Sequence, residues 1–396
     1  MVGALLTQQG FVTEGYSSVA MRNHWTSYYK WLQTGKWTWL AFVHQFTRLA
    51  LPVLNVKSVY LAIDDTLTLR SSQKAPSSKI HHQHGNKPNL VRFVRGQCWV
   101  SLAIIATRIN GDSVALPLLS RLIPGVGNTG KLVAANSLIR AIYHLFQGLK
   151  VTVLVDSWYM RRHFIECMQS KGFHVTGQVR IDTRLYDIPP ERQLGKRGRP
   201  RKYGDKYTPK RIAHLKKTEA TLKLYGKKQT IRYRSKLVKV RFLEGRMVIA
   251  VWSELENKDG AWKPARLFLS TDTALTPVQL IESYGRRWST ETMFNQLKLQ
   301  WGLKEAWQQT RQTLHRWVHI TNVAYGILQL LTCINSDEVL HLCQLSPWRK
   351  NEPITAGLIR KRLARILMHV PIQSWMNLKC KKISVLNMPI YNGSDG

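Results

Sequence analysis

Residues 151–156 read Val-Thr-Val-Leu-Val-Asp, and residues 58–65 read Ser-Val-Tyr-Leu-Ala-Ile-Asp-Asp. Short aliphatic and β-branched runs of this kind are typical of strands that are buried on both faces of a sheet. Both runs end on acids, Asp156 in the first and Asp64 with Asp65 in the second. A carboxylate at the end of an apolar strand is costly to desolvate unless a cation pairs with it. Two such strand ends side by side would favour a divalent metal ion, which takes carboxylate oxygens as ligands.

Other segments with strand and helix patterns surround these two runs. Further strands are predicted near 92–107, 113–119, 173–180 and 266–271, and helices near 131–147, 158–170, 277–300, 311–334 and 358–368. Between residues 192 and 241 the chain has 19 Lys and Arg but only two acids, and alternating stretches predict basic strands at 230–234 and 238–242. We therefore predict an α/β fold, in which a mixed sheet flanked by helices is interrupted by a basic, mainly β insertion.

This organisation divides the chain into five regions. They are a helical N-terminal region at 1–55, a first part of the core at 56–180, a basic β-rich insertion at 181–265, a second part of the core at 266–335, and a helical, basic tail at 336–396. Mixed three- and four-residue spacing of apolar residues predicts two helices in the first region, with a break at 33–36. That region could bind the ends of DNA, but it is short for a full recognition domain, which leaves a truncated chain open.

The composition is strongly basic, with 59 Lys and Arg against 23 Asp and Glu and a net charge of +36. Such a charge attracts polyanions, so nucleic acid is the leading partner and an anionic membrane surface is the rival. No apolar run reaches the roughly 20 residues that a membrane-spanning helix requires, and the N-terminus lacks the pattern of a secretion signal. Five cysteines without a C-x-x-C pair argue against a disulfide scaffold or a zinc site and predict reduced thiols in a cytosolic protein.

A third acid, Glu291, lies in the segment that is predicted to form a long helix from Pro277 to about residue 300. At about 100° per residue, one narrow stripe of this helix carries Tyr284, Arg287, Glu291 and Lys298. Taken alone, such a stripe is typical of a solvated surface with ion pairs along the helix. Combined with the two acidic strand ends in a basic chain, it indicates a site for metal ions and phosphate groups, with Arg287 and Lys298 on the phosphates.

These residues resemble the signatures of a known family. Tyr284, Arg287, Glu291 and Lys298 fit the spacing Y-(2)-R-(3)-E-(6)-K of bacterial insertion-sequence transposases without a gap. Residues 63–66, Ile-Asp-Asp-Thr, resemble the first Asp motif of that family, and residues 155–159, Val-Asp-Ser-Trp-Tyr, resemble its second. The chain therefore resembles, over roughly residues 58–335, a DDE transposase with an insertion between the second Asp and the Glu.

The resemblance implies a ribonuclease-H-like core in which Asp65, Asp156 and Glu291 are catalytic and bind two Mg²⁺ ions, with Mn²⁺ as a possible substitute. The family pattern places the first ligand just before Thr66, which favours Asp65. Neighbouring residues of a strand face opposite sides, so only one of the two adjacent acids can face the site, and Asp64 is the alternative.

The implied reaction is cleavage of double-stranded DNA at the terminal inverted repeats of an insertion sequence, followed by strand transfer into target DNA. The resemblance further implies DNA contacts by Tyr284, Arg287 and Lys298, a homodimer or higher oligomer on DNA, and a cytoplasmic location at the nucleoid. Two other functions stay open at this point. The chain could be a catalytically inactive, DNA-binding transposase relic, or a metal-dependent nuclease that cuts without joining.

Residues 196–202, Lys-Arg-Gly-Arg-Pro-Arg-Lys, resemble an AT-hook, whose Arg-Gly-Arg-Pro core lies in the minor groove of DNA. In this interpretation Arg197, Arg199 and Arg201 bind DNA, because arginine favours the negative potential of narrow A·T tracts. The alternative is a flexible basic loop that binds phosphates without sequence preference.

Overall fold

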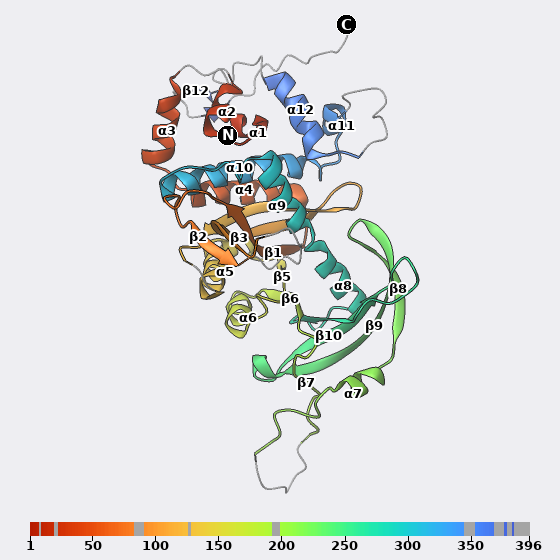
Figure 1. Ribbon diagram of the computed structural model, residues 1–396. Coiled ribbons are helices and arrows are strands. Elements are labelled where there is room, and N and C mark those ends of the chain that lie inside the picture. Colours follow the sequence, from red (N-terminus) through yellow and green to blue (C-terminus); the bar gives the residue numbers. More distant parts are fainter. Residues whose placement is uncertain are drawn as a thin grey trace.

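A mixed sheet of 11 strands organises the chain, in the order β2-β3-β1-β5-β6-β11-β10-β9-β7, with β4 paired to β3 and β8 paired to β9 (Figure 1). The computed structural model describes residues 1–7, 9–19, 23–82, 91–125, 128–191, 199–343, 353–367, 376–377 and 382–383. The strands of this sheet are β1 (Ser58–Leu69), β2 (Lys79–His82), β3 (Phe93–Thr107), β4 (Ser113–Leu122), β5 (Lys150–Val155), β6 (His174–Val179), β7 (Leu185–Tyr186), β8 (Thr218–Leu224), β9 (Lys227–Val240), β10 (Arg246–Leu255) and β11 (Arg266–Ser270). The predicted α/β class is therefore confirmed.

Helices cover the sheet, and four of them come before its first strand. They are α1 (Val2–Leu6), α2 (Val12–Ser17), α3 (Trp25–Thr34), α4 (Trp39–Leu54), α5 (Asn128–Ile142), α6 (Arg162–Gln169), α7 (Pro209–Ala213), α8 (Pro277–Arg286), α9 (Ser289–Gln300), α10 (Arg311–Leu331), α11 (Asp337–Cys343) and α12 (Ala356–Leu367). Short 3₁₀ turns follow α5 and β9, and β12 (Met376–Asn377) and β13 (Lys382–Ile383) form a separate pair. The two predicted N-terminal helices are confirmed as α3 and α4, and the Thr38 side chain caps α4 by accepting from the Ala41 N–H.

The two faces of β1 pack into different apolar clusters. Val59, Leu61 and Ile63 lie in one cluster with residues of α5 and α6, whereas Ala62 lies in another with residues of α9 and α10. β1 runs parallel to β5 and β5 runs parallel to β6, while β3 and β4 are antiparallel to their neighbours. Because side chains alternate along a strand, the next residue, Asp64, faces the α9 side of the sheet.

The predicted β insertion is a curved extension of the same sheet (Figure 1). β9 pairs with both β8 and β10, and β11 joins β10 to β6. α8 packs its apolar residues against one face of this extension, with Leu280 and Ile281 in a cluster that includes Ile231, Val251 and Phe268. The insertion is thereby connected to the core through both β11 and α8.

Two predicted elements differ from those in the structure. β1 does not end at its acids but continues to Leu69, because β3 remains paired with it as far as Gly96. The single helix expected from Pro277 to residue 300 is wrong, since α8 ends at Arg286 and α9 begins at Ser289. At this junction, the N–H groups of Arg287, Thr290 and Glu291 donate to carbonyls three residues earlier, which tightens the turn as in a 3₁₀ helix.

Within the described ranges, the helices include none that is long and apolar enough to cross a membrane. Cys98, Cys167, Cys333 and Cys343 are free thiols, and Cys380 lies outside the described residues.

Candidate active site

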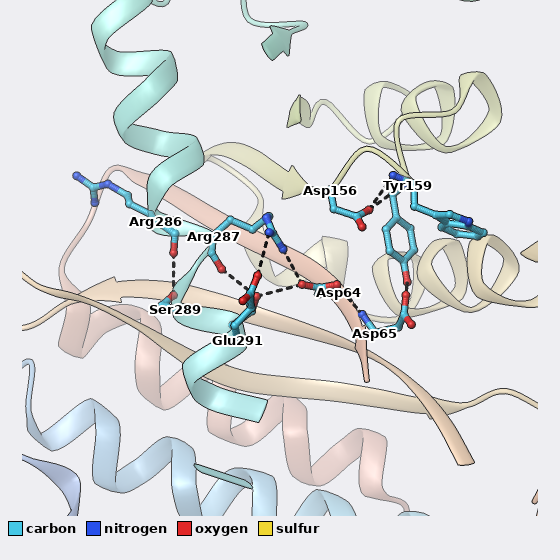
Figure 2. A network of polar contacts seen from close by, with 10 residues as sticks. Asp64, Asp65, Asp156, Tyr159, Arg286, Arg287, Ser289 and Glu291 are labelled. Atoms are coloured by element: carbon cyan, nitrogen blue, oxygen red, sulfur yellow. Dashed lines mark hydrogen bonds and ion pairs between the residues drawn. The ribbon is translucent and has the colours of Figure 1, made fainter. Parts of the chain in front are cut away.

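Three carboxylates from separate elements come together where β5 ends (Figure 2). Asp64 lies within β1, Asp156 directly follows β5, and Glu291 lies in the first turn of α9. Ile63 pairs with Val155 in the parallel β1–β5 ladder, so the two aspartates that follow lie at the same level and on the same face. Apolar residues hold α9 against that face, namely Met293, Phe294 and Leu297. The fold therefore gathers acids that are 92 and 135 residues apart in the chain.

Arg287 links two of these acids. Its Nη1 donates to Asp64 Oδ2 at 2.6 Å, and its Nη2 donates to Glu291 Oε1 at 3.3 Å. Only 11% of the Arg287 side chain and 15% of the Asp64 side chain are exposed, so solvent screens this pair little. The hydroxyl of Thr290 also donates to Asp64 Oδ2, at 3.4 Å. The guanidinium therefore supplies the positive charge that a largely buried carboxylate requires.

The surroundings of the three acids disfavour their ionised forms. Burial raises the pKa of Asp64 to about 7, although Arg287 opposes this shift, and the nearby charge of Asp156 adds to it. Burial also raises the pKa values of Asp156 and Glu291. One arginine thus does not balance the three carboxylates, and a further cation at this place would stabilise their charged forms.

Asp156 is oriented by the turn that follows β5. Its Oδ1 accepts hydrogen bonds from the backbone N–H groups of Trp158 at 2.9 Å and Tyr159 at 3.2 Å. Aspartate commonly closes a turn in this way, by binding the backbone two or three residues further along the chain. The turn therefore fixes the position of this carboxylate at the end of the strand.

Asp65, the acid favoured from the sequence as the first ligand, points away from Arg287. Its Oδ2 accepts from Lys131 Nζ at 2.7 Å, and its Oδ1 accepts from the Tyr159 hydroxyl at 3.1 Å. Figure 2 shows Asp64 directed toward Arg287 and Asp65 directed toward Tyr159. The strand's alternation explains this difference, and it places Asp64 rather than Asp65 beside Arg287 and Glu291.

A comparison with known protein families bears on the first part of this site. Residues 1–238 match the family described as DDE superfamily endonuclease, a segment that covers more than half of the chain and includes Asp64, Asp65 and Asp156. The chain belongs to this family. The matched segment ends within β9, so residues 284–298, which resemble the Y-R-E-K signature, lie beyond it. No curated protein matches the chain.

Membership among the DDE superfamily endonucleases implies nuclease or transposase activity on DNA, and such enzymes generally use divalent metals. The donor chemistry fits, because Asp64, Asp156 and Glu291 offer the hard oxygen ligands that Mg²⁺ prefers, in a place where their charge is under-compensated. As the side chains now lie, no group of three His, Cys, Asp or Glu in the described parts of the chain is arranged to hold a metal ion. Arg287 instead bonds two of the three acids.

The other members of the predicted helix stripe lie on different helices, Tyr284 in the last turn of α8 and Lys298 in the last turn of α9. Tyr284 is 7% exposed, its ring packs against Phe268 with centroids 4.6 Å apart, and the Arg287 guanidinium lies 5.6 Å from the ring centre. Tyr284 therefore supports Arg287 and presents little surface to solvent. Lys298 is half-buried in the last turn of α9, where burial and the neighbouring charge of Lys304 lower its pKa.

The basic insertion of this endonuclease carries both paired and exposed cations. Arg197 lies outside the described residues, whereas Arg199 and Arg201 are exposed. Part of the charge is internally paired, as Arg232 is with Glu254 and Arg211 is with Asp187.

The β8–β9 hairpin brings exposed cations close to the acid cluster. Lys227 and Lys228 are exposed at the hairpin tip, next to Tyr225. The Tyr225 ring contacts that of Trp288, directly after Arg287, at 5.5 Å between centroids. Exposed lysines of the insertion therefore lie beside the α8–α9 junction. The sequence alone indicates no role for Lys131, and it places Tyr159 only within the segment that resembles the second Asp motif of the family.

Proposed function

We propose that this endonuclease is a DNA transposase, which cleaves the ends of an insertion sequence and transfers them into target DNA. The observation that carries the proposal is that Arg287 bonds both Asp64 and Glu291 and that its charge also acts on Asp156, in a chain of net charge +36. Phosphoryl transfer depends mainly on positioning and on stabilisation of negative charge, which such a cluster beside a cationic surface can supply. The strand order β4-β3-β1-β5-β6, with β1, β5 and β6 parallel, supports a ribonuclease-H-like core.

We assign the catalytic and metal-binding roles to Asp64, Asp156 and Glu291, with Asp65 as the alternative to Asp64. Asp64 is favoured because it shares a face with Asp156 and contacts Arg287, whereas Asp65 is paired with Lys131. Two Mg²⁺ ions, or Mn²⁺ as a substitute, would activate the attacking water or 3′-hydroxyl and stabilise the leaving oxygen.

Residues of the chain would bind and orient the DNA around these acids. A guanidinium binds phosphate and carboxylate with the same pair of N–H donors. Arg287 can therefore release the carboxylates of Asp64 and Glu291 and bind a DNA phosphate in their place. That exchange would release Asp64 and Glu291 as substrate arrives. Tyr284, which supports Arg287, and Lys298, further along α9, would complete the Y-R-E-K signature as DNA-contacting residues.

The insertion would hold the terminal inverted repeats and the target DNA. Its exposed lysines neutralise phosphates and release counterions, which favours binding of either DNA. Arg199 and Arg201, together with Arg197, would lie in the minor groove of A·T-rich sequence. A transposase has to bring the two ends of the insertion sequence together, so the active protein would be a homodimer or a higher oligomer. It would act at the nucleoid in the cytoplasm.

A nicking assay tests the assignment. Purified full-length protein with Mg²⁺ or Mn²⁺ should nick duplexes that carry the inverted repeats flanking its gene. Asp156→Asn should abolish nicking and retain DNA binding, whereas Asp182→Asn, which removes an exposed acid paired with Arg180, should leave both nicking and DNA binding unchanged. Nicking that persists in the Asp156→Asn variant would show that the site is wrongly assigned.

A plasmid integration assay separates the transposase from its alternatives. Joined products support the transposase. Nicks without joined products would support a metal-dependent nuclease, and DNA binding without nicks would support an inactive relic.

A further inference from the structure

A second cluster of polar side chains lies on the other side of β1 from Arg287. Lys131 on α5 and Tyr159 after β5 both donate to the carboxylate of Asp65, at 2.7 and 3.1 Å. Tyr159 is fully buried, and about a quarter of the Lys131 and Asp65 side chains is exposed, 25% and 22% respectively. The transposition chemistry proposed above gives no role to Lys131 or Tyr159, and it names Asp65 only as the alternative to Asp64.

Tyr159 connects this cluster to the acid cluster. Its hydroxyl donates to Asp65, and its backbone N–H donates to Asp156 Oδ1 at 3.2 Å. The β1–β5 ladder ends at the pair Ile63–Val155, so no ladder hydrogen bond ties Asp156 to β1 beyond that point. Tyr159 spans this gap between the end of β5 and the strand that carries Asp64.

We infer that Asp65 is a positioning residue, which acts through Tyr159 to set the place of Asp156 relative to Asp64. The inference rests on the proposed function for the assignment of Asp64 and Asp156 as metal ligands. Lys131 forms an ion pair with Asp65 at 2.7 Å, and the Asp65 carboxylate serves as the hydrogen-bond acceptor of Tyr159. Partners that orient metal ligands in this way typically change metal affinity by about 10- to 100-fold.

Four variants separate a positioning role from direct metal binding. Tyr159→Phe removes one hydroxyl and keeps the packed ring, and Asp65→Ala removes the acceptor of that hydroxyl. Asp65→Asn keeps an oxygen that can accept from Tyr159, but an amide is a poor substitute for a carboxylate as a metal ligand. The double variant Asp65→Ala/Tyr159→Phe reports whether the two residues act as one unit. Tyr207→Phe is the matched control, since it removes a similar 2.9 Å bond to an aspartate, Asp187, in the insertion.

The experiment measures Mn²⁺ binding to the full-length protein by electron paramagnetic resonance, alongside the Mn²⁺ dependence of nicking and the thermal unfolding midpoint. Tyr159→Phe, Asp65→Ala and their double variant should each weaken Mn²⁺ binding by about tenfold. High Mn²⁺ should restore their maximum nicking rate. Asp65→Asn should stay within about threefold of wild type, and Tyr207→Phe should match wild type in both binding and nicking.

Either of two results would overturn the inference. One is an Asp65→Asn variant that loses Mn²⁺ binding as fully as Asp156→Asn, because Asp65 would then be a ligand. The other is wild-type Mn²⁺ binding in Tyr159→Phe, a variant that keeps its packed ring and so decides the question even if Asp65→Ala does not fold. Failure of the proposed function has a different signature, namely wild-type Mn²⁺ binding and nicking in Asp64→Asn, Asp156→Asn and Glu291→Gln alike.

Discussion

The core sheet and the inserted sheet of this molecule are continuous, yet they differ in burial and charge. In β3 of the core, every residue from Gly96 to Ala106 is buried, whereas most residues of β9 in the insertion are exposed or half-buried. Helices cover both faces of the core around β1, with α5 and α6 on one side and α9 and α10 on the other. The insertion instead presents lysines such as Lys227, Lys228 and Lys236 to solvent.

Because of this difference, solvent screens charges in the core and charges on the insertion to different extents. Charges inside the core interact strongly, because little water screens Arg287 and Asp64. Charges on the insertion are screened over about 10 Å at 0.1 M salt, and they act on DNA mainly through counterion release. We therefore expect changes in the core to alter chemistry or stability, and changes in the insertion to alter salt-dependent DNA binding.

The largest effect should follow from removing one charge of the acid cluster. Asp64→Asn is expected to lower the single-turnover rate of nicking by about 10³-fold or more, as for other residues at the centre of a catalytic site. DNA affinity, measured by gel shift on the same duplex, should be retained because the insertion is unchanged. An Asp64→Asn variant that still nicks DNA but binds it poorly would contradict the expectation that the core performs the chemistry and the insertion binds the DNA.

Stability should depend on the core far more than on the insertion. Leu61 in β1 is fully buried, and Leu61→Ala should reduce the free energy of unfolding by about 3 kcal/mol. Leu237 in β9 is 38% exposed, and Leu237→Ala should cost roughly 0.5 kcal/mol. Chemical denaturation of both variants measures this contrast, and equal losses would contradict it.

Acid should destabilise the core through two buried histidines of α10. Burial lowers the pKa of His315 to about 3 and that of His319 to about 4, and His319 Nε2 accepts the Ser120 N–H of β4 at 3.1 Å. Both rings are neutral when folded, whereas an unfolded histidine takes up a proton near pH 6.5. Their contribution is thus complete above pH 6.5 and is lost as the pH falls toward 4.

The expected loss is at most about 1.4 kcal/mol per pH unit for each histidine. Thermal or chemical unfolding between pH 7 and 4.5 measures this slope, and His319→Gln should reduce it. His214→Gln, at an exposed position beyond α7 in the insertion, should leave the slope as it is in wild type. Equal slopes in all three proteins would rule out a role for the buried histidines.

The smallest effect is expected from the hairpin tip of the insertion. Lys227→Gln/Lys228→Gln should lower the slope of log affinity against log salt by about 1.8, since each phosphate contact contributes about 0.9. Lys30→Gln/Lys36→Gln removes the same charge from exposed positions in the N-terminal region. If both double variants change the slope equally, the hairpin has no special place in DNA binding.

Local patterns predicted individual elements well, and they failed where neighbours far along the chain intervene. The apolar run at 151–155 is β5, and the long apolar helix expected at 311–334 is α10. The apolar spacing does not predict the break at Arg287 and Trp288, because it continues through the break and the only local signal there is Gly285, which a helix tolerates. The apolar run of β1 ends at Asp64, but the strand continues because β3 supplies hydrogen-bond partners past that point.

By itself, the sequence determined the α/β class, the position of its most basic segment and the strands that carry Asp64, Asp65 and Asp156, because these depend on short-range patterns of apolar and charged residues. Only the tertiary structure decided which of Asp64 and Asp65 faces α9, since that depends on a pairing register with β5 some 90 residues away. It also decided that Arg287 joins Asp64 to Glu291, a contact that requires the break between α8 and α9. The physical reason is that the local backbone of a strand or helix sets the direction of a side chain, whereas the packing of distant segments determines which residue that side chain contacts.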